Sequence, residues 1–166
     1  IYNSLIKSHI EYNLSCWGKV KSKEIEKIIV LQKRAVRYIS NLKYNSHTGQ
    51  TFKNLNILKF NDLVNLKQAT FMYRYANDKL PSSFKDVFSK LSNFDRSLSF
   101  ELPKTKKASL KLLPSFSMIK IWNELPLHIK RNRSLKSFKR QYSSHLSEYY
   151  NARCSKSNCY SCRNNS

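Results

Sequence analysis

Glycine, proline and acidic residues are all scarce in this chain, and each shortage excludes something. Two glycines and four prolines in 166 residues argue against a glycine-rich phosphate-binding loop and against a turn-dense β-sandwich. No apolar run reaches the roughly 18–20 residues that cross a bilayer, so we expect no membrane partner. Only 10 Asp and Glu accompany 31 Lys and Arg, which gives a formal net charge of +21. We therefore expect a helical and strongly basic protein.

The residues that are present predict a single, mostly helical domain. Apolar residues make up 40% of the chain, and its 9 Phe, 10 Tyr and 2 Trp can fill a core. Apolar side chains recur every three or four residues in long stretches, the spacing that buries one face of an α-helix. The predicted helices cover residues 1–17, 24–40, 61–77, 115–123 and 134–150, with shorter ones near 52–55 and 84–91 and a turn at 43–49.

Two stretches depart from the helical pattern. Leu98, Phe100 and Leu102 alternate with polar residues, which predicts a short extended or β segment near residues 97–102. The last residues contain three cysteines, and there we expect an irregular, flexible tail. The predicted fold class is therefore all-α with one short β segment and a Cys-containing tail. The chain is expected to have three consecutive regions. Residues 1–91 form a helical region, residues 92–150 form an extended basic loop followed by C-terminal helices, and residues 151–166 form the tail.

Positive charge is concentrated in one part of the chain. Residues 104–140 carry 11 basic residues and a single acid, Glu124, whereas residues 46–103 carry 8 basic and 5 acidic residues. An A/T-rich genome also raises the lysine content, but it acts on both stretches alike and does not explain the contrast. A charge this unbalanced opposes compaction unless a polyanion is near, so nucleic acid is the first partner to consider and an anionic membrane surface the second.

Contacts with a sugar-phosphate backbone require Lys and Arg side chains on a rigid face. Lys33, Arg34 and Arg37 lie together on the predicted helix 24–40, where a solvated helix face is an equally good explanation of their charge. The other candidates belong to the basic region 104–140, in its loop and around the last predicted helix. These candidate nucleic-acid contacts are Lys106, Lys107, Lys130, Arg131, Arg133, Lys136, Lys139 and Arg140.

Three of the four cysteines lie close together near the C-terminus. Cys154, Cys159 and Cys162 have the spacing C-x4-C-x2-C, and cysteines clustered in this way favour a metal over disulfides where secretion is not expected. Tetrahedral zinc needs a fourth ligand, for which His145 in the last predicted helix is the nearest. Free thiols in an irregular tail are the alternative interpretation. Cys16 lies on an apolar helical face and is expected to be buried.

No catalytic residue can be assigned in this chain. Two-metal phosphoryl transfer needs carboxylates that converge on cations about 4 Å apart, and the acids form no such pair in the sequence. The four histidines lack a neighbouring acid that would orient them, so packing or surface roles are the simpler interpretation. Whether the chain belongs to an enzyme stays open from these residues. Trp122, beside Ile119 and Leu125, fits a core position better than a base-stacking position.

Several short strings occur along the chain in the order found in one family. The most specific are W-N-E-L-P at residues 122–126 and S-L-K-S-F-K at residues 134–139. Together they resemble the C-terminal part of the reverse transcriptase polyprotein of non-LTR (LINE-type, jockey-like) retrotransposons. The resemblance runs over nearly the whole chain. Weaker strings that support it lie at residues 2–6, 9–12, 17–18, 31–37, 47–48 and 55–58.

The resemblance implies a non-catalytic role inside an RNA-directed DNA polymerase. Region 1–91 would be the thumb, whose basic helices grip the backbone of the RNA–DNA template–primer, and the rest would follow the thumb. The palm and fingers, which carry the catalytic aspartates, would lie upstream in the same polyprotein, and none of their residues has a counterpart here. The element's ribonucleoprotein would occur in the nucleus and cytoplasm. The alternative is a decayed or domesticated fragment that acts only as an interaction module or as a zinc-stabilised nucleic-acid-binding module.

Overall fold

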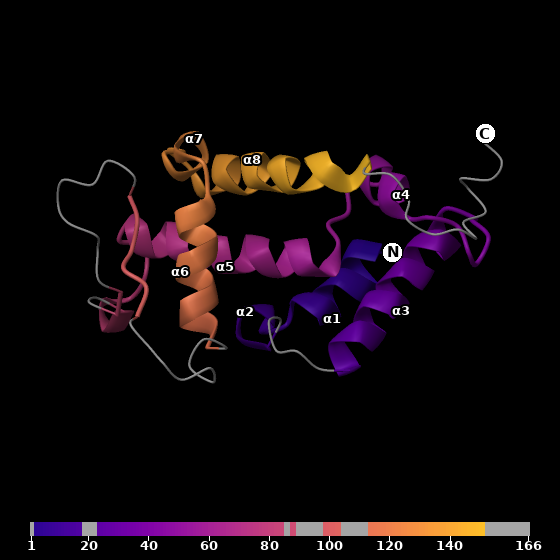
Figure 1. The fold of residues 1–166 in the computed structure, drawn as a ribbon, viewed down its shortest axis with the longest axis horizontal. Helices are drawn as coiled ribbons and strands as arrows, with labels where there is room; N and C mark the ends of the chain where they lie inside the picture. Colours follow the sequence, from indigo (N-terminus) through magenta and orange to yellow (C-terminus); the bar gives the residue numbers. More distant parts are fainter. Residues whose placement is uncertain (1, 18–22, 85–86, 89–97, 104–112, 152–166) are drawn as a thin grey trace. The chain divides into compact units, whose positions relative to one another are not determined.

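The computed structural model describes residues 2–17, 23–84, 87–88, 98–103 and 113–151 (Figure 1). Within these residues the chain is mostly helical and contains no strand, which confirms the all-α class. None of the described helices is both long and apolar enough to cross a membrane. The elements in order are the π-helix η1 (Tyr2–Lys7), α1 (Ser8–Glu11), α2 (Leu14–Trp17), α3 (Lys23–Ile39), α4 (Gly49–Asn54), α5 (Phe60–Ala76), the 3-10 turn η2 (Ser82–Phe84), α6 (Pro114–Glu124), α7 (Leu127–Lys130), α8 (Leu135–Ser147) and the 3-10 turn η4 (Glu148–Asn151).

The chain divides into two compact units. The first unit contains residues 1–12, 21–63 and 143–166, and the second contains residues 13–20 and 64–142. Boundaries between the units fall inside α5 and inside α8. The two units therefore interleave along the chain, whereas the regions predicted from the sequence are consecutive.

Most predicted helices are confirmed to within a few residues. The longest predicted stretches correspond to α3, α5, α6 and α8, and α6 starts at Pro114, whose fixed φ suits the first helical position. The first predicted helix is instead interrupted between α1 and α2, because Asn13 has a left-handed φ of 46°. The predicted helix near residues 84–91 is, in its described part, only the end of η2 followed by bends at Val87 and Phe88.

Asparagine and aspartate take the place of glycine at three helix ends. α3, α4 and α5 are followed by Asn41, Asn56 and Asp78, whose φ angles of 50°, 52° and 52° are left-handed. After α3, the Leu42 N–H donates to the Arg37 carbonyl at 2.9 Å, and equivalent bonds follow α4 and α5. These bonds close Schellman motifs, which satisfy the last helical carbonyls. The chain has only two glycines, and at these three helix ends it uses Asn and Asp, which after glycine adopt the left-handed conformation most readily.

A buried glutamine ties the first unit together. Gln32 of α3 is 2% exposed, and its Nε2 donates to the Tyr2 hydroxyl at 2.8 Å and to the Leu58 carbonyl at 2.9 Å. Its Oε1 accepts the Phe60 N–H at 2.9 Å. Because each polar atom of this amide has a partner, its burial joins η1, α3 and the start of α5 without leaving an unpaired group. The apolar cluster of the same unit contains Tyr2, Val36, Phe52 and Tyr150.

Tyr150 anchors η4 within the first unit. Its hydroxyl donates to Asp62 Oδ2 at 2.6 Å and accepts the Lys59 N–H at 2.8 Å. Burial, and then the hydrogen bond to the Asp62 carboxylate, raise the pKa of Tyr150 above its ordinary value. The backbones also approach closely, since a Cβ on Gly49 would lie 2.6 Å from the Tyr150 carbonyl oxygen. Glycine at the start of α4 is therefore required for this contact.

Aromatic rings fill the second unit. Phe138 of α8 is fully buried and stacks on Tyr73 of α5 with ring centroids 4.5 Å apart. Trp122 of α6 lies 6.2 Å from Phe138 and 6.4 Å from Phe100, again between ring centroids. Trp122 is fully buried, which confirms its predicted place in the core. Large rings at these separations contribute stacking energy in addition to the burial of apolar area.

A second buried glutamine, Gln68 of α5, has the same kind of role in the second unit. Its Nε2 donates to the Ser15 carbonyl of α2 at 3.0 Å, and its Oε1 accepts the Ser117 hydroxyl of α6 at 3.0 Å. α6 crosses α5 at this point (Figure 1). Gln68 thereby fixes the neighbours of α5 with satisfied hydrogen bonds.

The predicted short β segment is not a strand in its described part, residues 98–103. Phe100 is a single bridge position, and its backbone also bonds to a side chain: the Asn123 amide donates to the Phe100 carbonyl at 2.8 Å and accepts the Phe100 N–H at 3.0 Å. Trp122 Nε1 donates to the Leu98 carbonyl at 2.7 Å. The described part of the segment is non-helical, as predicted, and the Asn123 side chain ties it to α6.

Candidate nucleic-acid interface

Apart from the buried Lys130, the predicted basic contacts that the structure describes fall on two surfaces, and each surface belongs to a different unit. The first surface is a hollow beside α3, which we call the α3 hollow; it is lined by Val30, Lys33, Arg34, Arg37, Tyr44 and Asn45. The second surface, which we call the α8 basic face, lies on α8 and the loop before it. It consists of the exposed residues Arg131, Arg133, Lys136, Lys139 and Arg140.

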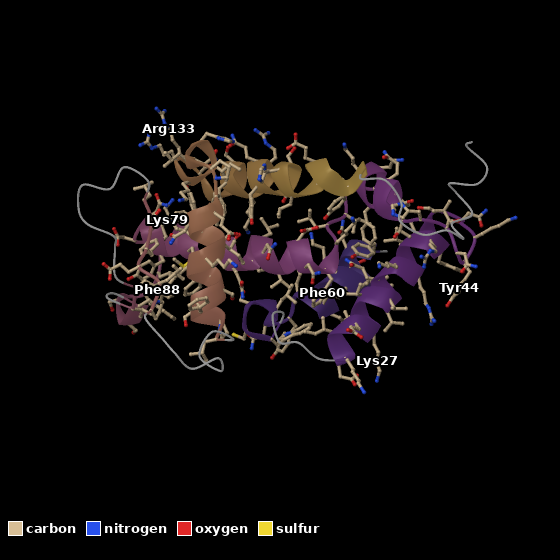
Figure 2. The ribbon with its side chains drawn as sticks, viewed as in Figure 1. Lys27, Tyr44, Phe60, Lys79, Phe88 and Arg133 are labelled. Atoms are coloured by element: carbon tan, nitrogen blue, oxygen red, sulfur yellow. The ribbon has the colours of Figure 1, made fainter. Side chains whose placement is uncertain are left out.

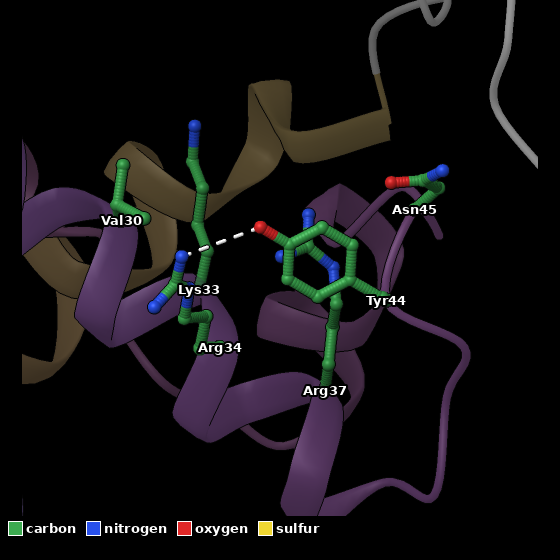
Figure 3. Close-up of a pocket in the computed structure, with 6 residues that line it drawn as sticks. All are labelled: Val30, Lys33, Arg34, Arg37, Tyr44 and Asn45. Atoms are coloured by element: carbon green, nitrogen blue, oxygen red, sulfur yellow. Dashed lines mark hydrogen bonds between the residues drawn. The ribbon is translucent and has the colours of Figure 1, made fainter.

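The α3 hollow has a volume of about 180 Å³ and is bounded by α3 and by the turn that follows it (Figure 3). Lys33 and Arg37 are four residues apart and Arg34 and Arg37 three, so these side chains share one side of the helix. The sequence left two explanations open for these residues, a solvated face or a binding site. The structure brings all three side chains together with Tyr44 around one hollow.

Hydrogen bonds orient the two arginines of the hollow. Arg34 Nη2 donates to the Tyr44 hydroxyl at 3.3 Å, and the guanidinium carbon lies 5.7 Å from the Tyr44 ring centroid. Arg37 Nε donates to the Ser46 carbonyl at 2.9 Å. No partner for the Arg37 Nη groups occurs among the residues that the structure describes. Both guanidinium groups are therefore positioned, and Arg37 keeps donors for an anion.

The turn that carries Tyr44 is fixed at both ends while its tip stays exposed. Asn41 reverses the chain after α3, and the Ser46 N–H donates to the Lys43 carbonyl at 3.0 Å. Ser46 is 1% exposed, whereas Tyr44 is 68% exposed. The predicted turn at residues 43–49 is confirmed, but the sequence did not indicate that it lies against α3.

The α8 basic face rests on the aromatic core of the second unit. Lys136, Lys139 and Arg140 are three and four residues apart and share an exposed side of α8. A different side of α8 is buried through Phe138 and Tyr142, which are 0% and 5% exposed. The cations therefore project from a helix whose rotation is set by its packing.

Hydrogen bonds fix the loop before α8. Ser134 is the N-cap of α8, since its hydroxyl accepts the Ser137 N–H at 3.1 Å. The Ser137 hydroxyl donates to Asn132 Oδ1 at 2.8 Å, and the Asn132 carbonyl accepts the Tyr73 hydroxyl at 2.7 Å. Arg133, in the middle of this loop, points away from the neighbouring helices (Figure 2). The loop thus presents its arginine from a fixed backbone.

The charges of the α8 basic face have little local compensation. No acidic residue occurs between positions 125 and 147. Within the described part of the chain, the side chains of Arg133, Lys136 and Arg140 form no ion pair or hydrogen bond. Positive charge concentrated on one surface attracts polyanions.

Lys130 differs from the other predicted contacts because it is buried. Lys130 is only 4% exposed, and its Nζ donates to the Asn123 carbonyl at 3.3 Å. The same Nζ lies 5.8 Å from the Trp122 ring centroid. Lys130 therefore packs on the core of the second unit and is not part of the α8 basic face.

The remaining predicted site residues are described only in part. His145 Nδ1 lies 4.0 Å from Glu148 Oε2. In the described residues, no group of His, Cys, Asp and Glu is arranged to hold a metal ion. The other predicted zinc ligands and two predicted phosphate contacts lie outside the described residues: Cys154, Cys159, Cys162, Lys106 and Lys107.

Cys16 is exposed, so the prediction that it is buried is wrong. The predicted continuous helix would have placed Cys16 on its apolar face. Because the helix is interrupted at Asn13, α2 is a separate single turn whose buried residue is Leu14.

Sequence reasoning missed the residues that complete the α3 hollow. Tyr44 and Asn45 lie in the turn after the helix, and Val30 belongs to α3 itself. A tyrosine at the tip of a polar turn close to a basic helix was the available signal, because such a turn offers no core to bury the ring.

No protein-family model, curated protein or solved structure matches this chain. The two surfaces are therefore interpreted from their own geometry and chemistry.

Proposed function

We propose that this chain binds nucleic acid through the sugar-phosphate backbone, as the non-catalytic thumb and post-thumb segment of a non-LTR retrotransposon reverse transcriptase. The catalytic aspartates would lie in the palm of the same polyprotein. The resemblance in sequence supports this assignment, and its two most specific strings form the scaffold of the α8 basic face. Trp122 and Phe138 from these strings are core residues, and Ser134 caps α8.

The α8 basic face is the observation that carries the proposal. Its lysines and arginines are exposed on a rigid scaffold, and no acid lies nearby in the sequence. Side chains of this kind contact phosphates and fix the position of a duplex without reading its sequence. A template–primer duplex is held in this way, because RNA and RNA–DNA helices are recognised mostly through their shape and backbone.

A salt titration of binding to an RNA–DNA hybrid tests the proposal. Each phosphate contact contributes about −0.9 for a duplex to the slope of log affinity against log salt. We expect a clear negative slope, and the triple variant Lys136→Gln, Lys139→Gln, Arg140→Gln should weaken binding to all sequences equally. An affinity independent of salt would contradict the proposal and favour the interaction module instead.

The gene itself tests the polymerase part of the proposal. We expect the upstream reading frame to encode a palm with paired aspartates. Early stop codons in that frame would instead indicate a decayed or domesticated element whose fragment kept only its binding surface.

A further inference from the structure

The α3 hollow contains a feature that binding to phosphates does not require. Phosphate contacts need only exposed cations, yet Tyr44 places an aromatic ring, 68% exposed, beside Lys33, Arg34 and Arg37. An aromatic ring next to cations is the combination with which proteins bind unpaired bases, since the base stacks on the ring while the cations hold its backbone. The α8 basic face differs in this respect, because the rings beneath it, Phe138 and Tyr142, are buried.

The size of the hollow limits what can enter it. Sites for drug-sized ligands have volumes of about 300–1,000 Å³, and this hollow has about 180 Å³. It therefore has room for one small planar group rather than for a longer ligand. A base inside a duplex is stacked on both faces and cannot present a face to Tyr44, whereas an unpaired base can.

The other side chains that line the hollow could contact the edge of the base and the phosphate of a nucleotide. Asn45 carries an amide that can both donate to and accept from the edge of a base. Arg34 holds the hydroxyl of Tyr44, which limits the orientations of the ring. Arg37 is fixed by Ser46 through Nε, so its Nη groups can donate to a neighbouring phosphate.

We propose that the α3 hollow binds one unpaired nucleotide of a single-stranded nucleic acid, with the base stacked on Tyr44 and the adjoining phosphate held by Arg37 and Lys33. This inference rests on the proposed nucleic-acid-binding function and narrows it. The first unit then prefers single strands, whereas the α8 basic face contacts any backbone.

Three fluorescent probes of equal length test this inference on the full chain: a single-stranded oligonucleotide, an abasic strand that keeps the phosphates but lacks the bases, and a blunt duplex. Stacking contributes about 1–3 kcal/mol per base, so the wild-type chain should prefer the normal strand to the abasic strand by about 5- to 150-fold. Tyr44→Ala should abolish this preference while leaving the affinity for the abasic strand within about twofold of wild type.

Two further variants separate stacking from general damage. Tyr44→Phe keeps the ring, so it should restore most of the preference. Tyr38→Ala is the control, because Tyr38 is a tyrosine of α3 that is even more exposed, at 89%, and does not line the hollow. Its preference should equal that of the wild type.

The possible outcomes distinguish this inference from the proposed function. If the wild-type chain binds all three probes with a negative salt slope but equally well, or if Tyr44→Ala keeps the preference, the base-stacking inference is overturned and the proposed function stands. If none of the probes binds with a salt-dependent affinity, both are overturned.

Discussion

The α3 hollow and the α8 basic face use the same cationic side chains in different surroundings. In the α3 hollow, arginines of a helix lie opposite an exposed tyrosine held by a single 3.3 Å hydrogen bond. On the α8 basic face, the cations project from a helix whose aromatic side is fully buried. Under the proposed function, charge would attract the backbone in both places, and the position of the rings would decide whether bases are also bound.

The two surfaces also differ in how they depend on the core. Phe138 stacks at 4.5 Å on Tyr73 directly beneath the α8 basic face. The exposed tip of the turn beside α3 carries its ring outside the core, and only the buried base of the turn, at Ser46, is packed. A mutation in the aromatic core should therefore affect the α8 basic face far more than the α3 hollow.

The largest expected effect comes from Phe138→Ala. It removes a fully buried ring between Tyr73 and Trp122, which should lower the free energy of unfolding by about 3–5 kcal/mol. Urea denaturation followed by circular dichroism measures this loss. Phe138→Leu keeps most of the volume and should lose clearly less. A loss below about 1 kcal/mol for Phe138→Ala would show that the α8 basic face does not depend on this core.

Gln32→Leu should have the next largest effect, and it acts on the first unit. It removes the hydrogen bonds of a buried amide to Tyr2, Leu58 and Phe60, which should lower stability by about 2–3 kcal/mol. Gln50→Leu is the matched control on an exposed helix side and should change stability by less than about 0.5 kcal/mol. Equal effects of the two changes in urea denaturation would contradict this assignment.

Part of this organisation could be predicted from the sequence, and part could not. Apolar spacing located α3, α5, α6 and α8, because that spacing records which side of a helix is buried. It did not indicate α7, a single turn at Leu127–Lys130 that follows Pro126 and is too short to show a periodic pattern. It also missed the break at Asn13, because a left-handed residue leaves the apolar spacing around it unchanged.

The residues of the candidate site could also be predicted only in part. The basic residues of both surfaces were visible in the sequence, because exposure is the ordinary state of Lys and Arg. The burial of Lys130 was not visible, since it depends on how its stem packs on Trp122. The ring of Tyr44 could not be assigned to a site either, because only the folded turn brings it to α3.

The pH dependence of stability should show a smaller effect, which comes from Tyr150 in the first unit. The pKa of Tyr150 is raised in the folded state above the ordinary value of 10.0, so folding favours the protonated hydroxyl. This contribution to stability is complete below pH 10 and is lost as the pH rises above it. Urea midpoints measured from neutral to alkaline pH should fall for the wild type and fall less steeply for Tyr150→Phe. Equal slopes for the two proteins would contradict the role of this hydroxyl.

The smallest effect is expected at the end of α3. Asn41 has a φ of 50°, which alanine adopts less readily, so Asn41→Ala should lower stability by about 1 kcal/mol. Asn41→Gly should leave stability unchanged or raise it slightly, because glycine adopts this conformation without strain. Thermal unfolding of the two variants makes the comparison, and a stable alanine variant would count against the helix-end motif.

The most direct test of the central claim compares two triple variants of the second unit in a salt titration with an RNA–DNA hybrid. One removes Lys136, Lys139 and Arg140 from the α8 basic face, and the other removes the same charge from exposed positions of α5 and α6 and just after α5, through Arg74→Gln, Lys79→Gln and Lys120→Gln. We expect the first variant to lower the magnitude of the salt slope by about 2–3 and the second to change it by less than about 1. Equal changes in the two slopes would contradict the account, because binding would then follow net charge rather than a built surface.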